Sequence, residues 1–241
     1  MYTPQVNHIS LQVPSGPLLV KGRERDTRRR FCNLTSLEDE GRDCTVEFCH
    51  CLHVLSVPQG SVVDVLLVDE GGPCKANHPF HLHGNHFRVL GMGKVGGNAS
   101  REETEKLLRR GEIRTRLEDA PFKDTVTVPS GGYTLIRFLA DNPGYWMMHC
   151  HLDYHMELGM GLVWEVGDPA SFPLPPRGFP VCDDYIPSAG TEAGATTTTE
   201  TATTEQEGDE ALLLTSGEVA TTFSLLAVFA SVFLLASDLY A

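Results

Sequence analysis

Seven of the ten histidines in this 241-residue chain fall in two short clusters, whose spacing restricts the fold more than any other feature. The clusters are His78-Pro-Phe-His81-Leu-His83, with His86 close behind, and His149-Cys150-His151-x-x-x-His155. Residues 145–151 have the composition of a β-strand, in which successive side chains point to opposite faces. His149 and His151 would then share one face while Cys150 points to the other. This strand could therefore contribute ligands to two metal sites, one on each face, and other segments of the chain would supply the remaining ligands.

The Cys150 face has the composition of a copper site. His155 and Met160 follow in the segment that leaves the strand, and Pro79 imposes a bend that separates His78 from the rest of its cluster. A cysteine, two histidines and a weakly bound axial methionine are the ligands of a blue-copper electron-transfer site. We therefore predict a copper site formed by His78, Cys150, His155 and Met160.

The opposite face is expected to carry a second metal centre. His81 and His83 are two residues apart and share a face if extended, as His149 and His151 do. A structural zinc site is the alternative, but zinc takes four tetrahedral ligands and would leave several of these donors unused. His86 matches no ligand position, and we expect it either at the surface or beside a ligand histidine.

The remaining pattern is that of an all-β domain with one surface helix. Short alternating or apolar runs separated by Pro and Gly turns are typical of a sandwich or barrel. The expected strands are residues 53–57, 61–68, 124–128, 133–140, 145–151 and 161–166. Ser100 and Glu103 form a capping box, and Gly111 is a plausible stop, so a solvated helix is expected between them.

The two clusters resemble the last two copper motifs of the multicopper oxidases, the family of laccases and ferroxidases. Asp124-Thr-Val, Asn142-Pro-Gly and Trp146 also look like its laccase branch, particularly the arthropod forms. The resemblance covers about residues 1–186. It implies the third domain of that family, an all-β, cupredoxin-like Greek-key β-sandwich.

The resemblance also implies a role for each site residue. His78, Cys150 and His155 would bind type 1 copper with Met160 axial; His81 would bind type 2 copper; His83, His149 and His151 would bind the type 3 pair. Type 1 copper takes single electrons from a small reductant, a diphenol, ferrous iron or ascorbate. The electrons then pass through the catalytic residues Cys150, His149 and His151 to the trinuclear cluster, which reduces dioxygen to water. Asp124 is a candidate acceptor that orients a ligand histidine, or an ordinary residue at a strand start.

The sequence departs from the family in one respect. The trinuclear cluster of the family uses eight histidines, four of them from two His-x-His motifs in its first domain, and this chain has no further such motif. We therefore expect a partial chain whose upstream cupredoxin domains supply the other half. One alternative is a stand-alone, membrane-tethered blue-copper electron carrier without dioxygen reduction. Another is a copper-binding or adhesive ectodomain without turnover.

The C-terminal composition predicts a stalk and an anchor. Residues 187–241 contain eight acids and no Lys or Arg, so nucleic-acid binding is not expected. Residues 187–218 are Thr- and Glu-rich and predict a disordered stalk, and residues 219–241 predict a GPI signal or a transmembrane helix. Both place the copper domain outside the cell, attached to its surface.

The cysteines and sequons agree with an extracellular location. Sequons occur at Asn33 and Asn98, which predicts a glycoprotein. With Cys150 reserved for metal, disulfides are expected among the other six cysteines, with no pairing specified. These are Cys32, Cys44, Cys49, Cys51, Cys74 and Cys182.

Overall fold

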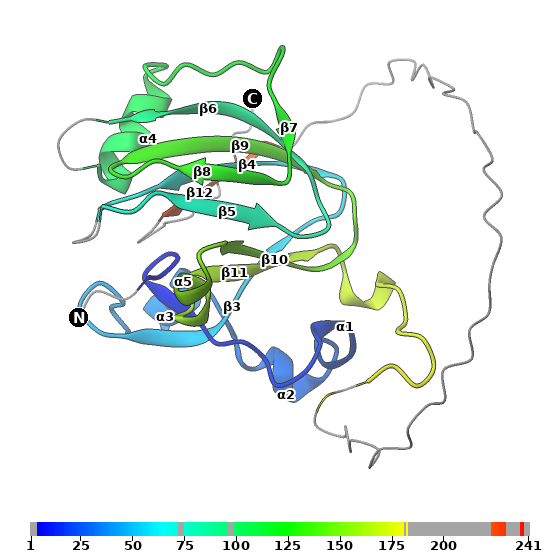
Figure 1. Cartoon of the computed structure of the whole chain (residues 1–241). Helices are drawn as coiled ribbons and strands as arrows, with labels where there is room; N and C mark the ends of the chain where they lie inside the picture. Colours follow the sequence, from blue (N-terminus) through cyan, green and yellow to red (C-terminus); the bar gives the residue numbers. More distant parts are fainter. Residues whose placement is uncertain are drawn as a thin grey trace, which may run out of the picture.

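The structure is a computed structural model that describes residues 4–71, 75–95, 99–180 and 182, together with the backbone of 223–229 and 237–238. The described residues form two β-sheets, with short helices around them (Figure 1). The first has the order β1-β3-β11-β10-β5-β8, with β2 beside β3. Its strands are β1 (Ile9–Leu11), β2 (Phe31–Cys32), β3 (Cys49–Val57), β5 (His78–Leu82), β8 (Thr125–Val128), β10 (Gly144–Cys150) and β11 (Gly161–Val166).

The second sheet has the order β13-β12-β4-β9-β6-β7. Its strands are β4 (Ser61–Val68), β6 (Phe87–Lys94), β7 (Phe122–Lys123), β9 (Gly132–Ala140), β12 (Phe223–Phe229) and β13 (Ser237–Asp238). Many neighbours in the two sheets are not consecutive in the chain, and β11 runs parallel to β3 but antiparallel to β10. The predicted fold class, an all-β, cupredoxin-like Greek-key β-sandwich, is confirmed.

The largest hydrophobic cluster among the described residues joins the two sheets. Trp164 on β11, Phe138 on β9 and Phe80 on β5 are each at most 1% exposed. The rings of Phe138 and Trp164 meet edge to face, with centroids 5.3 Å apart. Burying a side chain of this size contributes about 1.5–3 kcal/mol. The core thus fixes β5, which carries the first histidine cluster, against the strands of the opposite sheet.

The predicted strands agree closely with the observed ones. Residues 61–68 and 161–166 are β4 and β11 with unchanged bounds, β8 and β9 differ by one residue at one end, and β10 begins and ends one residue earlier than predicted. The strand predicted at residues 53–57 begins four residues earlier, at Cys49. β6 was not predicted, because Gly91 and Gly93 interrupt its apolar pattern.

The helices are short and lie at the surface. They are α1 (Leu18–Lys21), α2 (Arg25–Arg28), α3 (Leu34–Asp39), α4 (Arg101–Arg109), α5 (Asp153–Glu157) and the 3-10 helix η1 (Pro169–Ser171). α4 is the predicted helix, and its Ser100 cap accepts a hydrogen bond from the Glu103 N–H at 3.2 Å. α5 was not predicted, and it matters for the site because it carries His155.

A buried carboxylate attaches the N-terminal segment to the sheet. Arg28 in α2 donates to both carboxylate oxygens of Glu165 on β11, at 2.6 and 3.3 Å. The hydroxyl of Ser56 donates to the same carboxylate at 3.0 Å. The side chain of Glu165 is 6% exposed and that of Arg28 is 38% exposed. Arg28 also donates to the Tyr145 hydroxyl at 2.9 Å, so this residue connects α2 to two strands.

Two disulfides lie at the N-terminal end of the first sheet. They join Cys32 to Cys51 and Cys44 to Cys49, which confirms four of the six predicted participants. Cys182 is instead a free thiol, and it is exposed. Cys74 lies outside the described residues, so its pairing stays a prediction.

The C-terminal segment is described in part. Residues 223–229, within the predicted anchor, form β12, which runs parallel to β4 with Phe223 opposite Val62. Apart from 237–238, the rest of this segment and the predicted stalk lie outside the described residues. Among the residues described, no helix is long and apolar enough to cross a bilayer. Neither form of anchor is tested by these residues, and both stay predictions.

A buried histidine in β3 should make stability depend on pH. His53 is 0% exposed, its Nε2 lies 3.4 Å from the Asn7 amide, and its Nδ1 has no hydrogen-bond partner among the described residues. Burial lowers the pKa of His53 from 6.5 to about 3. Below pH 6.5 the unfolded chain therefore binds a proton that the folded chain does not, and stability falls as the pH falls toward about 3.

We expect His53→Leu to lose less stability than the wild type between about pH 7 and about pH 4.5. Urea unfolding of both proteins at the two pH values measures the difference. The other buried histidines change the free energy of unfolding by the same amount in both proteins, so their effect cancels when the two pH-dependent losses are compared. Equal losses in the two proteins would show that His53 does not titrate in this window.

Candidate metal centre

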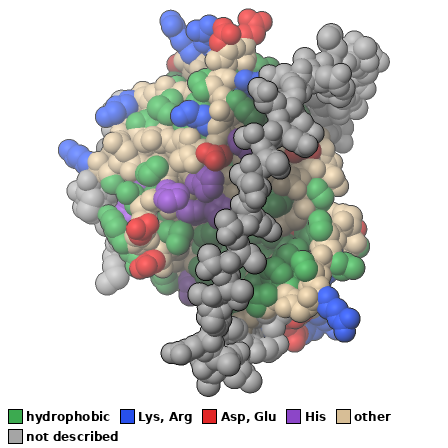
Figure 2. Space-filling view, turned by 45° about the vertical axis from the view of Figure 1, so that its right-hand side comes forward, with side chains coloured by type: hydrophobic (Ala, Val, Ile, Leu, Met, Phe, Trp, Pro, Cys, Tyr) green, Lys and Arg blue, Asp and Glu red, His purple; other side chains and the backbone are tan. Residues whose placement is uncertain are grey.

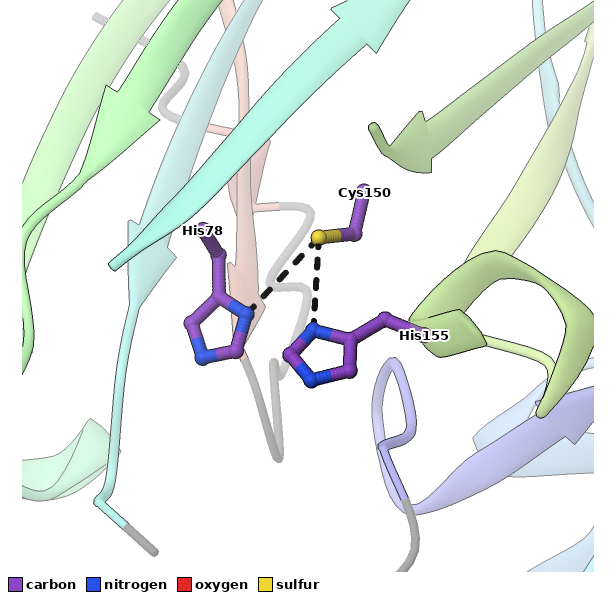
Figure 3. Close-up of side chains that lie close together, drawn as sticks. All are labelled: His78, Cys150 and His155. Atoms are coloured by element: carbon purple, nitrogen blue, oxygen red, sulfur yellow. Dashed lines mark hydrogen bonds between the residues drawn. The ribbon is translucent and has the colours of Figure 1, made fainter. Parts of the chain in front are cut away.

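Three buried side chains converge between the two sheets (Figure 3). His78 begins β5, Cys150 ends β10, and His155 lies in α5. The Cys150 Sγ is 3.7 Å from Nδ1 of His78 and 3.6 Å from Nδ1 of His155. One candidate ligand atom from each of the three residues lies within 4.8 Å of the others. The three are 8%, 0% and 4% exposed, so the group is closed to solvent.

Strand pairing explains this convergence. β5 and β10 are antiparallel neighbours, with Phe80 opposite Cys150 and His81 opposite His149. His78 is two residues from Phe80, so it faces the same side of the sheet as Cys150. The turn after β10 enters α5 and returns His155 to that side.

Met160 is held beside this group by its backbone. Its N–H donates to the His155 carbonyl at 2.9 Å, and its carbonyl accepts from the Cys150 N–H at 2.9 Å. The residue is 1% exposed and belongs to the core. Its predicted role as axial ligand stays a prediction.

Burial disfavours the charged forms of the three side chains and leaves their donor atoms suited to a metal ion. Desolvation raises the pKa of the Cys150 thiol to about 11 and lowers the pKa of both His78 and His155. The imidazoles are therefore neutral, with lone pairs available. A cation that binds must displace the thiol proton, and it then neutralises the buried thiolate. One sulfur and two imidazole nitrogens fit copper well.

The other four predicted ligands cluster on the opposite side of β10. Nε2 of His83 lies 3.0 Å from Nε2 of His149, and the rings of His149 and His151 are 5.5 Å apart between centroids. The ring of His81 is 4.9 Å from that of His83. His149 is buried, but His83 and His151 are exposed. Figure 2 shows histidine side chains gathered in a patch at the molecular surface.

Hydrogen bonds orient two of these rings. Nδ1 of His81 lies 3.0 Å from the Asp124 carbonyl and 3.0 Å from the Thr125 hydroxyl, and Nδ1 of His149 lies 3.0 Å from the Cys150 carbonyl. A carbonyl only accepts, so both rings carry their proton on Nδ1 and have an unprotonated Nε2, whose lone pair can bind a metal. Histidines that bind metals commonly donate their other ring N–H to a carbonyl in this way, which fixes the orientation of the ring.

The structure refines the prediction for Asp124. Its backbone carbonyl, rather than its carboxylate, contacts His81. The carboxylate accepts from the Thr125 hydroxyl at 3.0 Å, and this bond lowers the Asp124 pKa. Thr125 was missed by sequence reasoning, although its place beside Asp124 at the start of a strand was a usable signal. His86, expected at the surface or beside a ligand histidine, is exposed and stacks on Phe122 at 5.2 Å between ring centroids.

A glycine holds the loop after the first cluster. Gly84 has φ +60°, and a side chain there would collide with the ring of Trp146. The Asn142 side chain donates to the Gly84 carbonyl at 2.7 Å, and the Trp146 indole donates to the Asn142 carbonyl at 2.8 Å. The Asn142-Pro-Gly turn and Trp146 therefore fix the position of His83, which comes just before Gly84.

The fold and the donor set define a cupredoxin-like domain with two clusters of candidate metal ligands. Comparison with known sequences identifies the family to which this domain belongs. A family profile described as multicopper oxidase matches residues 14–170. The chain belongs to the multicopper oxidase family.

Curated relatives include plant laccases. Laccase-12 of Arabidopsis thaliana is 39% identical over 127 residues, which are 51% of this chain and 21% of that protein. Laccase-25 of Oryza sativa subsp. japonica is 38% identical over 149 residues, 60% of this chain and 24% of that protein. The chain thus spans about a quarter or less of the relatives it matches. The resemblance to arthropod forms stays a prediction.

Solved structures with similarity include the laccase from Botrytis aclada. It is 23% identical, with a TM-score of 0.45, and the match covers 69% of this chain and 26% of that one.

Proposed function

We propose that this chain is the C-terminal copper domain of a laccase-like multicopper oxidase. The observation that supports this most is the pair of clusters on opposite sides of β10, with Cys150 in one and its two neighbouring histidines in the other. Copper bound at the buried cluster would accept single electrons from a small reductant and pass them on for the reduction of dioxygen to water.

The buried cluster would hold the copper that accepts electrons. Cys150, His78 and His155 would hold type 1 copper with Met160 axial, and the neutral imidazoles and the displaced thiol proton suit that ligand set. The burial of these three side chains would keep water away from a bound copper ion and so limit reorganisation around it. Cys150 is covalently linked to His149 and His151, so β10 itself supplies the route between the two centres.

The exposed cluster would form half of a trinuclear centre. His81 would bind type 2 copper, and His83, His149 and His151 the type 3 pair. The open face of these rings suits a second cupredoxin domain that adds the remaining histidines. The predicted extracellular location and the GPI or transmembrane attachment belong to the same proposal. The reductant is a diphenol, ferrous iron or ascorbate.

The stand-alone electron carrier is the second candidate, and it is supported by the fact that the three donors of the buried cluster all belong to this chain. Copper counting separates the two. We would purify the native protein from its source with an antibody against residues 1–186, and measure its copper content and its oxygen uptake with hydroquinone. Four coppers per chain and catalytic oxygen uptake are expected of the oxidase. One copper and no oxygen uptake would contradict the oxidase and support the carrier.

A further inference from the structure

One acidic residue next to the buried cluster has no role in the proposal above. Asp69 directly follows β4 and is 3% exposed. Its carboxylate accepts from the Gly71 N–H at 3.1 Å and from the Gly131 N–H at 2.7 Å, one bond to each oxygen. Its own N–H donates to the Gly132 carbonyl at 2.9 Å. The carboxylate is thus held between its own loop and the turn that leads into β9.

This fixed carboxylate faces a predicted copper ligand. Its Oδ1 lies 3.8 Å from Nε2 of His78, and the two side chains are 4% and 10% exposed. The contact is electrostatic, because 3.8 Å is longer than a hydrogen bond. The other ring nitrogen, Nδ1, faces the Cys150 sulfur at 3.7 Å. The two nitrogens of His78 therefore have different neighbours, a carboxylate on one side and the metal-binding cluster on the other.

The turn alone does not require a charged residue at this position. A neutral side chain such as serine can accept a backbone N–H, whereas burying a carboxylate is unfavourable unless positive charge and hydrogen bonds compensate it. A thiolate, two neutral imidazoles and a cupric ion carry a net charge of about +1, and the same set with a cuprous ion is about neutral. A buried negative charge beside this set stabilises the oxidised form more than the reduced form.

We propose that Asp69 is a positioning residue for the type 1 copper site. Its carboxylate keeps the proton of His78 on Nε2, so that Nδ1 is free to bind copper, and its charge lowers the reduction potential of the bound ion. The inference rests on the proposed function, because it requires copper at Cys150.

The test is a redox titration of the whole chain loaded with copper, in the wild type and in Asp69→Asn. We expect the variant to keep its blue absorption band. We also expect its electron-exchange equilibrium with a reference couple to shift about tenfold toward the reduced protein, which is about 59 mV for one electron. Asp69→Ser, which also removes the charge, should shift the equilibrium in the same direction and serves as a second variant if the first does not fold.

Glu70→Gln is the matched control. It removes a charge one residue along the chain, but the Glu70 carboxylate accepts from the Arg101 N–H at 2.8 Å and so faces α4. We expect a much smaller shift for this variant. An unchanged potential in folded, copper-loaded Asp69→Asn or Asp69→Ser would overturn the inference and leave Asp69 as a turn residue only. A wild-type chain that binds copper without a blue band would instead refute the proposed function.

Discussion

Replacing Cys150 with serine should abolish the blue absorption band of the copper-loaded chain. The band requires a thiolate bound to copper, and Cys150 is the sulfur donor that lies within reach of both His78 and His155. A serine hydroxyl does not ionise near neutral pH and is a harder donor than sulfur. We expect complete loss of the band and a large loss of copper affinity, measured by visible absorption and by metal analysis.

Cys182→Ser is the matched control, because Cys182 is the other free cysteine that the structure describes and is exposed. That variant should keep the band and its copper content. Circular dichroism would confirm that both variants keep the β-sandwich. A blue band that survives in Cys150→Ser would refute the site, and a band lost in Cys182→Ser would place the thiolate elsewhere.

The second large effect is expected on stability, from Arg28→Ala. The variant leaves the Glu165 carboxylate, 6% exposed, without its cationic partner. Breaking a buried ion pair on one side costs roughly 3–5 kcal/mol, and the 38% exposure of Arg28 reduces this because water screens the pair. We expect a loss of about 2–3 kcal/mol, which lowers Tm by about 5–10 °C in a domain of this size.

Arg29→Ala tests whether the loss is specific to the buried pair. Arg29 is the next residue, and it pairs at 3.3 Å with Asp26, whose side chain is 91% exposed. A surface pair of this kind contributes about 0–1 kcal/mol. Thermal unfolding should therefore separate the two variants clearly, and equal Tm values would mean that the Glu165 contact does not anchor α2.

Local pattern was enough to predict most strands and the faces of β10. Alternation placed Cys150 on one face and its two neighbours on the other because that parity depends only on the strand being extended. The position of His155 could not be derived in this way, because it depends on α5, a five-residue helix with no capping signal.

Contacts between distant segments were the harder part. Asp69 and Gly131 are 62 residues apart, and only the packing of two loops brings them together. The signal that could have identified Asp69 was an acid at the end of a continuously apolar strand, where a surface role is unexpected. For Asp124 the residue was the right one, but sequence alone does not distinguish a backbone carbonyl from a side chain as the acceptor.

The position of both clusters on one strand has a consequence for motion between domains. In the proposed oxidase, the buried site and the exposed histidines are joined by a fixed length of covalent chain through Cys150. A hinge movement that withdrew the neighbouring domain would disassemble the exposed centre without lengthening that chain. With that centre disassembled, electrons held at the buried site would have no acceptor, so internal electron transfer and oxygen reduction would stop together and docking of the two domains would be a condition for turnover.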